Sequence, residues 1–155
     1  NGIGLSENSM MTLSLCDKVK NIDPKNKLVR VEAGARVQQV VDALAEYNLT
    51  LQNFASISEQ QIGGFLQVGA HGTGLKIPPV DEQIVSLKIV TPQFGPMEIS
   101  EETNPELFKL VKVGLGSFGV ITEMTIKCVE RHLLTERTFV LSHDEVRQHH
   151  QSLLH

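Results

Sequence analysis

Residues 60–74 read QQIGGFLQVGAHGTG, in which five glycines surround a short apolar segment and one histidine. Residues 58–61 (SEQQ) are suited to start a short helix whose free N–H groups face an anion, because the first amides of a helix lack partners within it. The glycines of residues 69–74 let the backbone bend into a concave run of amides. The stretch therefore indicates a cradle for a pyrophosphate or a glycine-rich surface loop, and the spacing does not decide between them. His71 alone is more typical of a hydrogen-bonded turn residue than of a base or a ligand.

Composition excludes several classes of protein. The chain has 155 residues, 41% of them hydrophobic, and a formal charge of -4, which suits one core of about one domain. Its 14 basic residues are scattered among 18 acidic ones, so no basic stripe is present and nucleic acid is not expected as a partner. No run approaches the roughly 18 apolar residues of a membrane helix. Cys16 and Cys128 lie far apart in the sequence, which indicates two reduced thiols and no metal site.

Four segments are predicted to be strands. Residues 28–32 and residues 82–91 are rich in β-branched side chains, and a turn at residues 94–96 lets residues 97–99 pair back as a hairpin. Residues 120–129 alternate with a period of two and have one mostly apolar face, as an antiparallel strand over a core requires. That face holds Val120, Thr122, Met124, Ile126 and Cys128.

Three helices are predicted among these strands. The first follows the turn at residues 33–35, and its apolar residues recur at i, i+3, i+4 and i+7. They are Val37, Val40, Val41 and Leu44. The second begins at Asn104 and Pro105, ends near Gly114, and has an apolar face. That face holds Leu107, Leu110 and Val111. The third is indicated by a Ser-x-x-Glu capping box at residues 142–145.

A second glycine cluster, GLGSFG at residues 114–119, matches the G-x-G-x-x-G pattern of dinucleotide-binding folds. Those folds need a strand, then the glycine turn, then a helix, so that the pyrophosphate meets the helix N-terminus. Here the predicted order is helix, glycines, strand. We therefore interpret the cluster as a helix C-cap with a tight entry into a strand, which explains Gly114 better than it explains three closely spaced glycines.

Six motifs occur along the chain in a fixed order. They are NGIGLS (1–6), GARV (34–37), LQNFASISEQQIGG (51–64), QVGAHGTG (67–74), PPVDEQIVSLKIVTP (78–92) and GLGSFGVITEMTI (114–126). In this combination the chain resembles the sugar-lactone oxidoreductases of the vanillyl-alcohol-oxidase flavoprotein superfamily. The resemblance implies an α+β fold, a PCMH-type FAD-binding domain with two α/β subdomains and FAD between them. This chain would supply mainly the second, an antiparallel sheet flanked by helices.

The resemblance also implies where FAD is bound. Ala55 and Ser56 would lie at the flavin and pyrophosphate, and Gln61 and Gly64 would continue that contact. Three further sets of residues follow from the same motifs. Val68, Gly69, Ala70 and His71 would run along the cofactor, the backbone of Val120 and Ile121 would contact adenine, and Gly2, Gly4 and Ser6 would sit just beyond a first pyrophosphate loop.

In the dehydrogenase branch of this family, a hydride passes from L-galactono-1,4-lactone to flavin N5 and the product is L-ascorbate, in the last step of ascorbate biosynthesis. The electrons go to cytochrome c at the mitochondrial inner membrane, facing the intermembrane space, although no targeting segment is read in this chain. Ala55 would act as an oxygen gate over the flavin, because oxidase relatives have glycine at this position. The acid and arginine that hold the lactone belong to a substrate-capping domain, so no catalytic acid or base is expected here.

The resemblance divides the chain at residue 131. Residues 1–131 would be a partial FAD-binding domain that lacks its N-terminal subdomain, and residues 132–155 would begin the capping domain. Two alternative functions stay open at this stage. One is an aldonolactone oxidase that passes electrons to oxygen, and the other is a non-catalytic nucleotide-binding module.

Overall fold

A six-stranded antiparallel sheet organises the chain in the computed structural model, which describes residues 5–54 and 56–153. The strands are β1 (Val19–Asp23), β2 (Leu28–Glu32), β3 (Leu49–Leu51), β4 (Ile84–Thr91), β5 (Gly95–Ser100) and β6 (Val120–Glu130). Their order is β1-β2-β6-β4-β5, and β3 pairs with the far end of β6. The last strand in sequence therefore lies at the centre, where it joins the strands that precede it.

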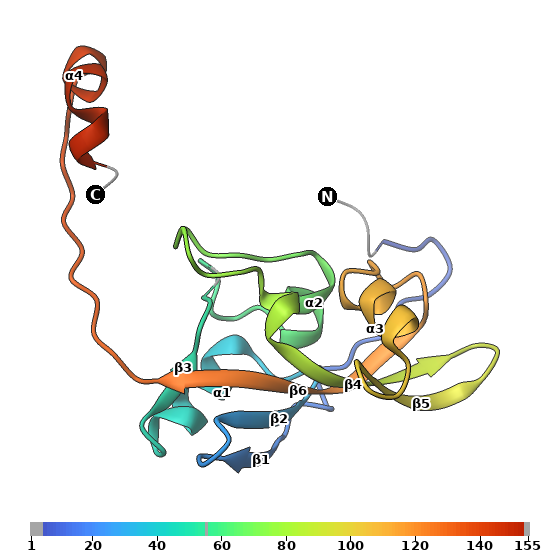
Figure 1. The fold of residues 1–155 in the computed structure, drawn as a ribbon. Coiled ribbons are helices and arrows are strands. Elements are labelled where there is room, and N and C mark those ends of the chain that lie inside the picture. Colours follow the sequence, from blue (N-terminus) through green and yellow to red (C-terminus); the bar gives the residue numbers. More distant parts are fainter. Residues whose placement is uncertain (1–4, 55, 154–155) are drawn as a thin grey trace.

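The helical elements are α1 (Val37–Ala45), α2 (Ile62–Gln67), the 3-10 turn η1 (Val80–Gln83), α3 (Pro105–Lys112) and α4 (His143–Leu153). All of them except α4 contribute buried side chains to the core. Figure 1 shows α2 and α3 on the same side of β4 and β6, while α4 stands apart at the end of an extended segment. The core between helices and sheet includes the large side chains of Phe65 from α2, Phe108 from α3 and Leu44 from α1, each at most 2% exposed.

Most predicted elements are confirmed. The helix after the 33–35 turn, the β4–β5 hairpin and the long antiparallel strand are present at the expected places. The capping box is confirmed in both directions, because the Glu145 carboxylate accepts the Ser142 N–H at 2.7 Å and the Ser142 hydroxyl accepts the Glu145 N–H at 3.4 Å. Residues 131–142 form no helix or strand, so the prediction that a capping domain begins at residue 132 stays a prediction.

Two predicted faces are wrong in detail. In α3 the buried side chains are Phe108 and Val111, while Leu110 is 59% exposed, because the ring of Phe108 takes the core position one turn before Val111. In β6, Ile121 is buried and Val120 is 39% exposed. The pairing with β4 shifts by one residue at this point, so that Lys88 faces Glu123 and Ile89 faces Ile121. This bulge reverses the alternation of side chains that a regular strand would have.

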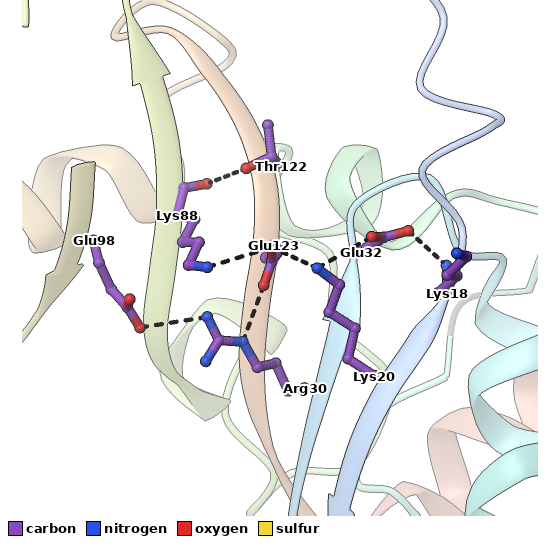
Figure 2. A network of polar contacts seen from close by, with 8 residues as sticks. All are labelled: Lys18, Lys20, Arg30, Glu32, Lys88, Glu98, Thr122 and Glu123. Carbon is purple, nitrogen blue, oxygen red and sulfur yellow. Dashed lines mark hydrogen bonds and ion pairs between the residues drawn. The ribbon is translucent and has the colours of Figure 1, made fainter. Parts of the chain in front are cut away.

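The face of the sheet opposite the helices carries a network of charges around Glu123 of β6 (Figure 2). The Glu123 side chain is 13% exposed and its carboxylate accepts from Lys20 at 2.7 Å, Arg30 at 3.0 Å and Lys88 at 3.4 Å. The hydrogen bond from Lys20 is the largest cause that lowers the pKa of Glu123 to about 2; burial opposes it, and Arg30 and the positive charges of Lys20 and Lys88 assist it. The network thus joins β1, β2, β4 and β6 through one carboxylate.

The lowered pKa predicts how Glu123 contributes to stability. A carboxyl group that is more acidic in the folded state stabilises it fully above the ordinary pKa of 4.5, and this contribution fades as the pH falls toward about 2. Glu123→Gln should lower the free energy of unfolding at neutral pH by about 1–3 kcal/mol, since it leaves the three cations without their common partner. Denaturant unfolding at neutral pH and near pH 3 should show a smaller difference between variant and parent at the acidic value.

The matched control is Glu98→Gln on β5, the strand at the edge of the sheet that pairs with β4. Glu98 is 54% exposed on its side chain and meets Arg30 at 3.6 Å, so its loss should change stability by less than about 0.5 kcal/mol. An equal loss for Glu123→Gln at both pH values would show that charge is not the source of its effect.

Candidate functional site

A hollow of about 440 Å³ lies between α2, the glycine loop at residues 114–119 and the N-terminal segment. Its lining includes residues that the sequence predicted as cofactor contacts, namely Gln61, Gly64, Val68, Val120 and Ile121. These residues come from places in the sequence that are more than 50 positions apart. The hollow forms because α2 and the start of β6 meet over the sheet, so the fold brings the two groups of predicted contacts together.

The other predicted contacts do not line this hollow. Gly69 follows α2 with a φ of +61°, and the Ala70 carbonyl accepts the Val80 N–H at 2.9 Å. His71 is exposed, and its Nδ1 lies 2.8 Å from the carbonyl oxygen of Gly72, as expected for a turn histidine. Ser56 is exposed. Ala55, Gly2 and Gly4 lie outside the described residues.

The start of α2 differs from the prediction. Residues 58–60 form a turn, and the helix begins only at Ile62. The Ile62 N–H donates to Ala35 at 2.8 Å and the Gly63 N–H donates to Ala33 at 2.9 Å. The expectation that free N–H groups at residues 58–61 begin a helix and face an anion is therefore wrong, because the helix starts later and its first two amides bind the turn after β2.

Gly63 and Gly64 are adjacent but have different roles. A Cβ on Gly63 would lie 2.9 Å from the Cβ of Ala33, so this glycine is needed for α2 to pack against the turn after β2. A Cβ on Gly64 would meet no atom within 4 Å, and Gly64 is exposed at the edge of the hollow. The bare backbone at Gly64 therefore serves no contact within the described part of the chain, and leaves room for a bound group.

The glycine loop forms the opposite wall of the hollow. α3 ends at Lys112, the Gly114 N–H donates back to Val111 at 3.2 Å, and β6 begins directly after Gly119. Gly116 and Gly119 have φ values of +79° and +141°, and a Cβ on Gly119 would overlap the Val90 carbonyl oxygen. The order helix, glycines, strand is confirmed, so the loop is a helix end and a strand entry, and all three glycines are now explained.

Sequence reasoning missed Gly34, which anchors the third wall. The Gly34 N–H donates to the Cys16 carbonyl at 2.8 Å, and a Cβ at this position would overlap the Leu13 carbonyl oxygen. This contact holds the N-terminal segment against the sheet, where Met11 and Leu13 line the hollow. The Ala-Gly-Ala pattern indicated a turn, but it contains no signal for the N-terminal segment that packs against it at Leu13 and Cys16.

A second missed residue is Asn53. It is 3% exposed and its side-chain amide donates to the Pro78 carbonyl, which Gln83 also approaches at 3.4 Å. The two buried amides fix the loop before η1 to the end of β3. Their signal in sequence is weak, because Asn and Gln are ordinarily surface residues.

The chemistry of the hollow follows from its lining. Its walls are aliphatic side chains and glycine backbone with the amides of Gln61 and Gln67, and none of its lining residues is ionisable. Such a surface binds and orients a largely flat or apolar group, but it has no acid or base for proton transfer.

Other sites are limited in the described part of the chain. Among residues 5–54 and 56–153, no three His, Cys, Asp or Glu side chains are placed to hold a metal ion. Cys16 is an exposed free thiol, and burial raises the pKa of the Cys128 thiol to about 12. None of the helices described is both long enough and apolar enough to cross a membrane.

Comparison with known proteins gives three findings. A family model described as an FAD binding domain matches residues 1–95. The chain is 56% identical over 154 residues to the mitochondrial L-galactono-1,4-lactone dehydrogenase of Brassica oleracea, which covers 99% of this chain and 26% of that protein. It is 33% identical over 144 residues to L-gulonolactone oxidase of Bos taurus. That aligned region covers 93% of this chain and 33% of the oxidase. The chain thus spans about a quarter to a third of the length of these relatives.

Among solved structures, the fold resembles 6-hydroxy-D-nicotine oxidase from Arthrobacter nicotinovorans. The TM-score is 0.70 with 24% sequence identity, over 76% of this chain and 26% of that chain. This likeness and the family model confirm the expected fold, a PCMH-type α+β domain with an antiparallel sheet and flanking helices. The family model confirms FAD as the cofactor.

The open backbone at Gly64 gives a test of where FAD lies. Gly64→Ala should leave the apoprotein as stable as the parent, or more stable by about 0.5–1 kcal/mol, because it replaces a helical glycine where no atom is near. If FAD packs on this backbone, the added methyl group should reduce the flavin content of the purified full-length protein. Flavin absorbance per protein and thermal unfolding without FAD measure the two effects separately.

Gly69→Ala is the comparison variant. Its φ of +61° strains any side chain, so it should destabilise the apoprotein by about 1 kcal/mol whether or not FAD is near. Full flavin content in Gly64→Ala would contradict a cofactor contact at that residue.

Proposed function

The chain belongs to the family of FAD-binding domains, and we propose that it is the part of an aldonolactone dehydrogenase that holds FAD. The full-length enzyme would oxidise L-galactono-1,4-lactone to L-ascorbate, the last step of ascorbate biosynthesis. The observation that carries this proposal is the identity to the lactone dehydrogenases, which extends over nearly the whole chain and is well above the identity to the lactone oxidases.

The residues of the hollow fit a part of FAD. Gly64 and Gly116 leave open space where a Cβ would stand, and the walls of Val68, Leu115 and Ile121 suit the flat face of a ring. When bound, FAD would supply an acceptor for two electrons in the form of a hydride. The residues of this chain bind and orient the cofactor and exclude water from the apolar side of the hollow. Substrate-activating groups belong to the remainder of the full-length protein.

The proposed reaction has a direct experiment. The full-length protein should purify with bound flavin, whose absorbance is lost when L-galactono-1,4-lactone is added without oxygen, with ascorbate as the product. A flavoprotein that binds FAD but is not reduced by the lactone would overturn the substrate assignment. A protein with no bound flavin would overturn the cofactor role as well.

The second candidate is an aldonolactone oxidase, favoured by the similarity to L-gulonolactone oxidase over most of the chain. We propose that the residue at position 55 distinguishes a dehydrogenase from an oxidase. Ala55 lies outside the described residues. An added methyl group can close a narrow approach to the flavin, because packed protein has few voids larger than a water molecule. Oxygen would then react slowly while the lactone still reduces the flavin from the other side.

Ala55→Gly in the full-length protein should therefore speed reoxidation of the reduced flavin by oxygen, by about tenfold or more, and leave reduction by lactone largely unchanged. Stopped-flow measurement of both half-reactions tests this. Rapid reoxidation with alanine in place would favour the oxidase, and equal rates for parent and variant would show that Ala55 is simply a small packing residue.

We also propose that the full-length protein is mitochondrial and passes its electrons to cytochrome c at the inner membrane, facing the intermembrane space. The names of the dehydrogenase relatives support the mitochondrion, and the formal charge of -4 suits docking to a basic electron carrier. Cytochrome c reduction should then slow as ionic strength rises, because salt screens the attraction that raises the encounter rate. A rate independent of ionic strength, or no reduction at all, would contradict this partner.

A further inference from the structure

Gln67 joins the two walls of the hollow through one side chain. It is the last residue of α2, and its Oε1 accepts the Gly116 N–H of the glycine loop at 2.9 Å. Its Nε2 donates to the Val111 carbonyl at 2.7 Å and approaches the Lys112 carbonyl at 3.5 Å. The single amide therefore binds both the C-terminus of α3 and the loop that follows it.

These bonds meet the end of α3 and the loop that follows it, where the Val111 carbonyl also accepts the Gly114 N–H at 3.2 Å. The last C=O groups of an α-helix receive no N–H from a following turn of that helix. Val111 and Lys112 are in the last turn of α3. Leu115 has a φ of 52°, a left-handed conformation that residues other than glycine seldom adopt, so the loop includes one residue that the backbone alone does not favour. In the described part of the chain, every hydrogen bond between α2 and residues 105–119 comes from Gln67.

The bridge matters because the two segments that it joins, α2 and the glycine loop, both line the hollow. Gly64 and Val68 face it from α2, while Leu115 and Gly116 face it from the loop. Phe65 of α2 and Phe108 of α3 are both buried in the core, but apolar burial is non-directional and does not by itself set a hydrogen-bonded register. A two-way amide bridge fixes the separation and register of the walls, since it fails when either wall moves by about 1 Å.

We propose that Gln67 is a positioning residue for FAD, which sets the width of the hollow by holding the glycine loop at a fixed distance from α2. The inference rests on the proposed function, since it takes the hollow to be part of the FAD site. Gln67 acts through Gly116 and Val111 and needs no contact of its own with the cofactor.

Two variants separate positioning from general stability. Gln67→Met keeps the length of the side chain and removes both hydrogen bonds. Gln67→Glu keeps an acceptor for the Gly116 N–H but, when ionised, places a negative charge against the carbonyls of Val111 and Lys112. When protonated, the same carboxyl group again offers one donor and one acceptor, as the native amide does. Gln93→Glu is the control, because it makes the same change at an exposed turn away from the hollow.

The measurement is the Kd of FAD for the full-length apoprotein, from quenching of flavin fluorescence, well below the midpoint of thermal unfolding. Gln67→Met should raise this Kd by about tenfold or more. Gln67→Glu should raise it similarly near pH 8 and recover by about threefold or more near pH 5, relative to the parent at each pH. Gln93→Glu should match the parent at both pH values.

Three outcomes would overturn the inference. A folded Gln67→Met protein that binds FAD within about twofold of the parent would show that the bridge does not position the cofactor. A Gln67→Glu protein whose Kd for FAD is raised equally at both pH values would show that the hydrogen bond donated to the Val111 carbonyl does not position the cofactor. If the parent itself bound no FAD, the proposed function would fail together with the inference, whereas normal FAD binding by all variants would overturn the inference alone.

Discussion

The structure depends most on β6, a strand of 11 residues whose backbone N–H and C=O groups need hydrogen-bond partners along its length. An unpaired peptide group buried in a core costs as much as a lost hydrogen bond, so a long central strand requires neighbours on both edges. β2 and β4 supply them along most of its length, and β3 pairs with residues 128–130. β1 and β5 then extend the sheet by pairing with β2 and β4.

The same strand links the core to the candidate site. Met124, Ile126 and Cys128 point into the core, while the bulge near residue 122 turns the strand so that Val120 and Ile121 reach the hollow. On the opposite face, Glu123 collects the charges of three strands. One strand therefore carries the hydrophobic core, the charge network and a wall of the site, and the bulge allows the first and last of these functions to coexist.

The many glycines of the chain have different tasks, which only the three-dimensional structure separates. Gly34, Gly63 and Gly119 allow one backbone segment to pass close to another, and a Cβ at any of them would overlap a neighbour. Gly64 and Gly116 have open space beside them instead. The sequence motif does not reveal this difference, because a glycine needed by the fold and a glycine needed by a ligand look the same in one sequence.

Elements with a local physical cause were predictable from sequence. The capping box of α4, the proline at the start of α3 and the alternation in β6 each arise from residues a few positions apart, and each was found at its expected place. The errors arose where distant residues decide. The register shift between β4 and β6 exchanged the exposure of Val120 and Ile121, and the bonds from Ile62 and Gly63 to the turn after β2 occupied amides expected to be free.

The candidate site shows the same division. Residues on one motif were easily grouped, but the bridge from Gln67 to Val111 and Gly116 spans 44 and 49 residues, and a lone glutamine after an apolar helix gives no sign of it. The two walls are joined by neutral amide bonds, while the charged groups lie on the far face of the sheet. None of the side chains that line the hollow is ionisable, so none of them changes charge over the pH range in which carboxylates and histidines titrate. A surface that binds without titrating is suited to hold a cofactor in one orientation whatever the protonation state of groups around it.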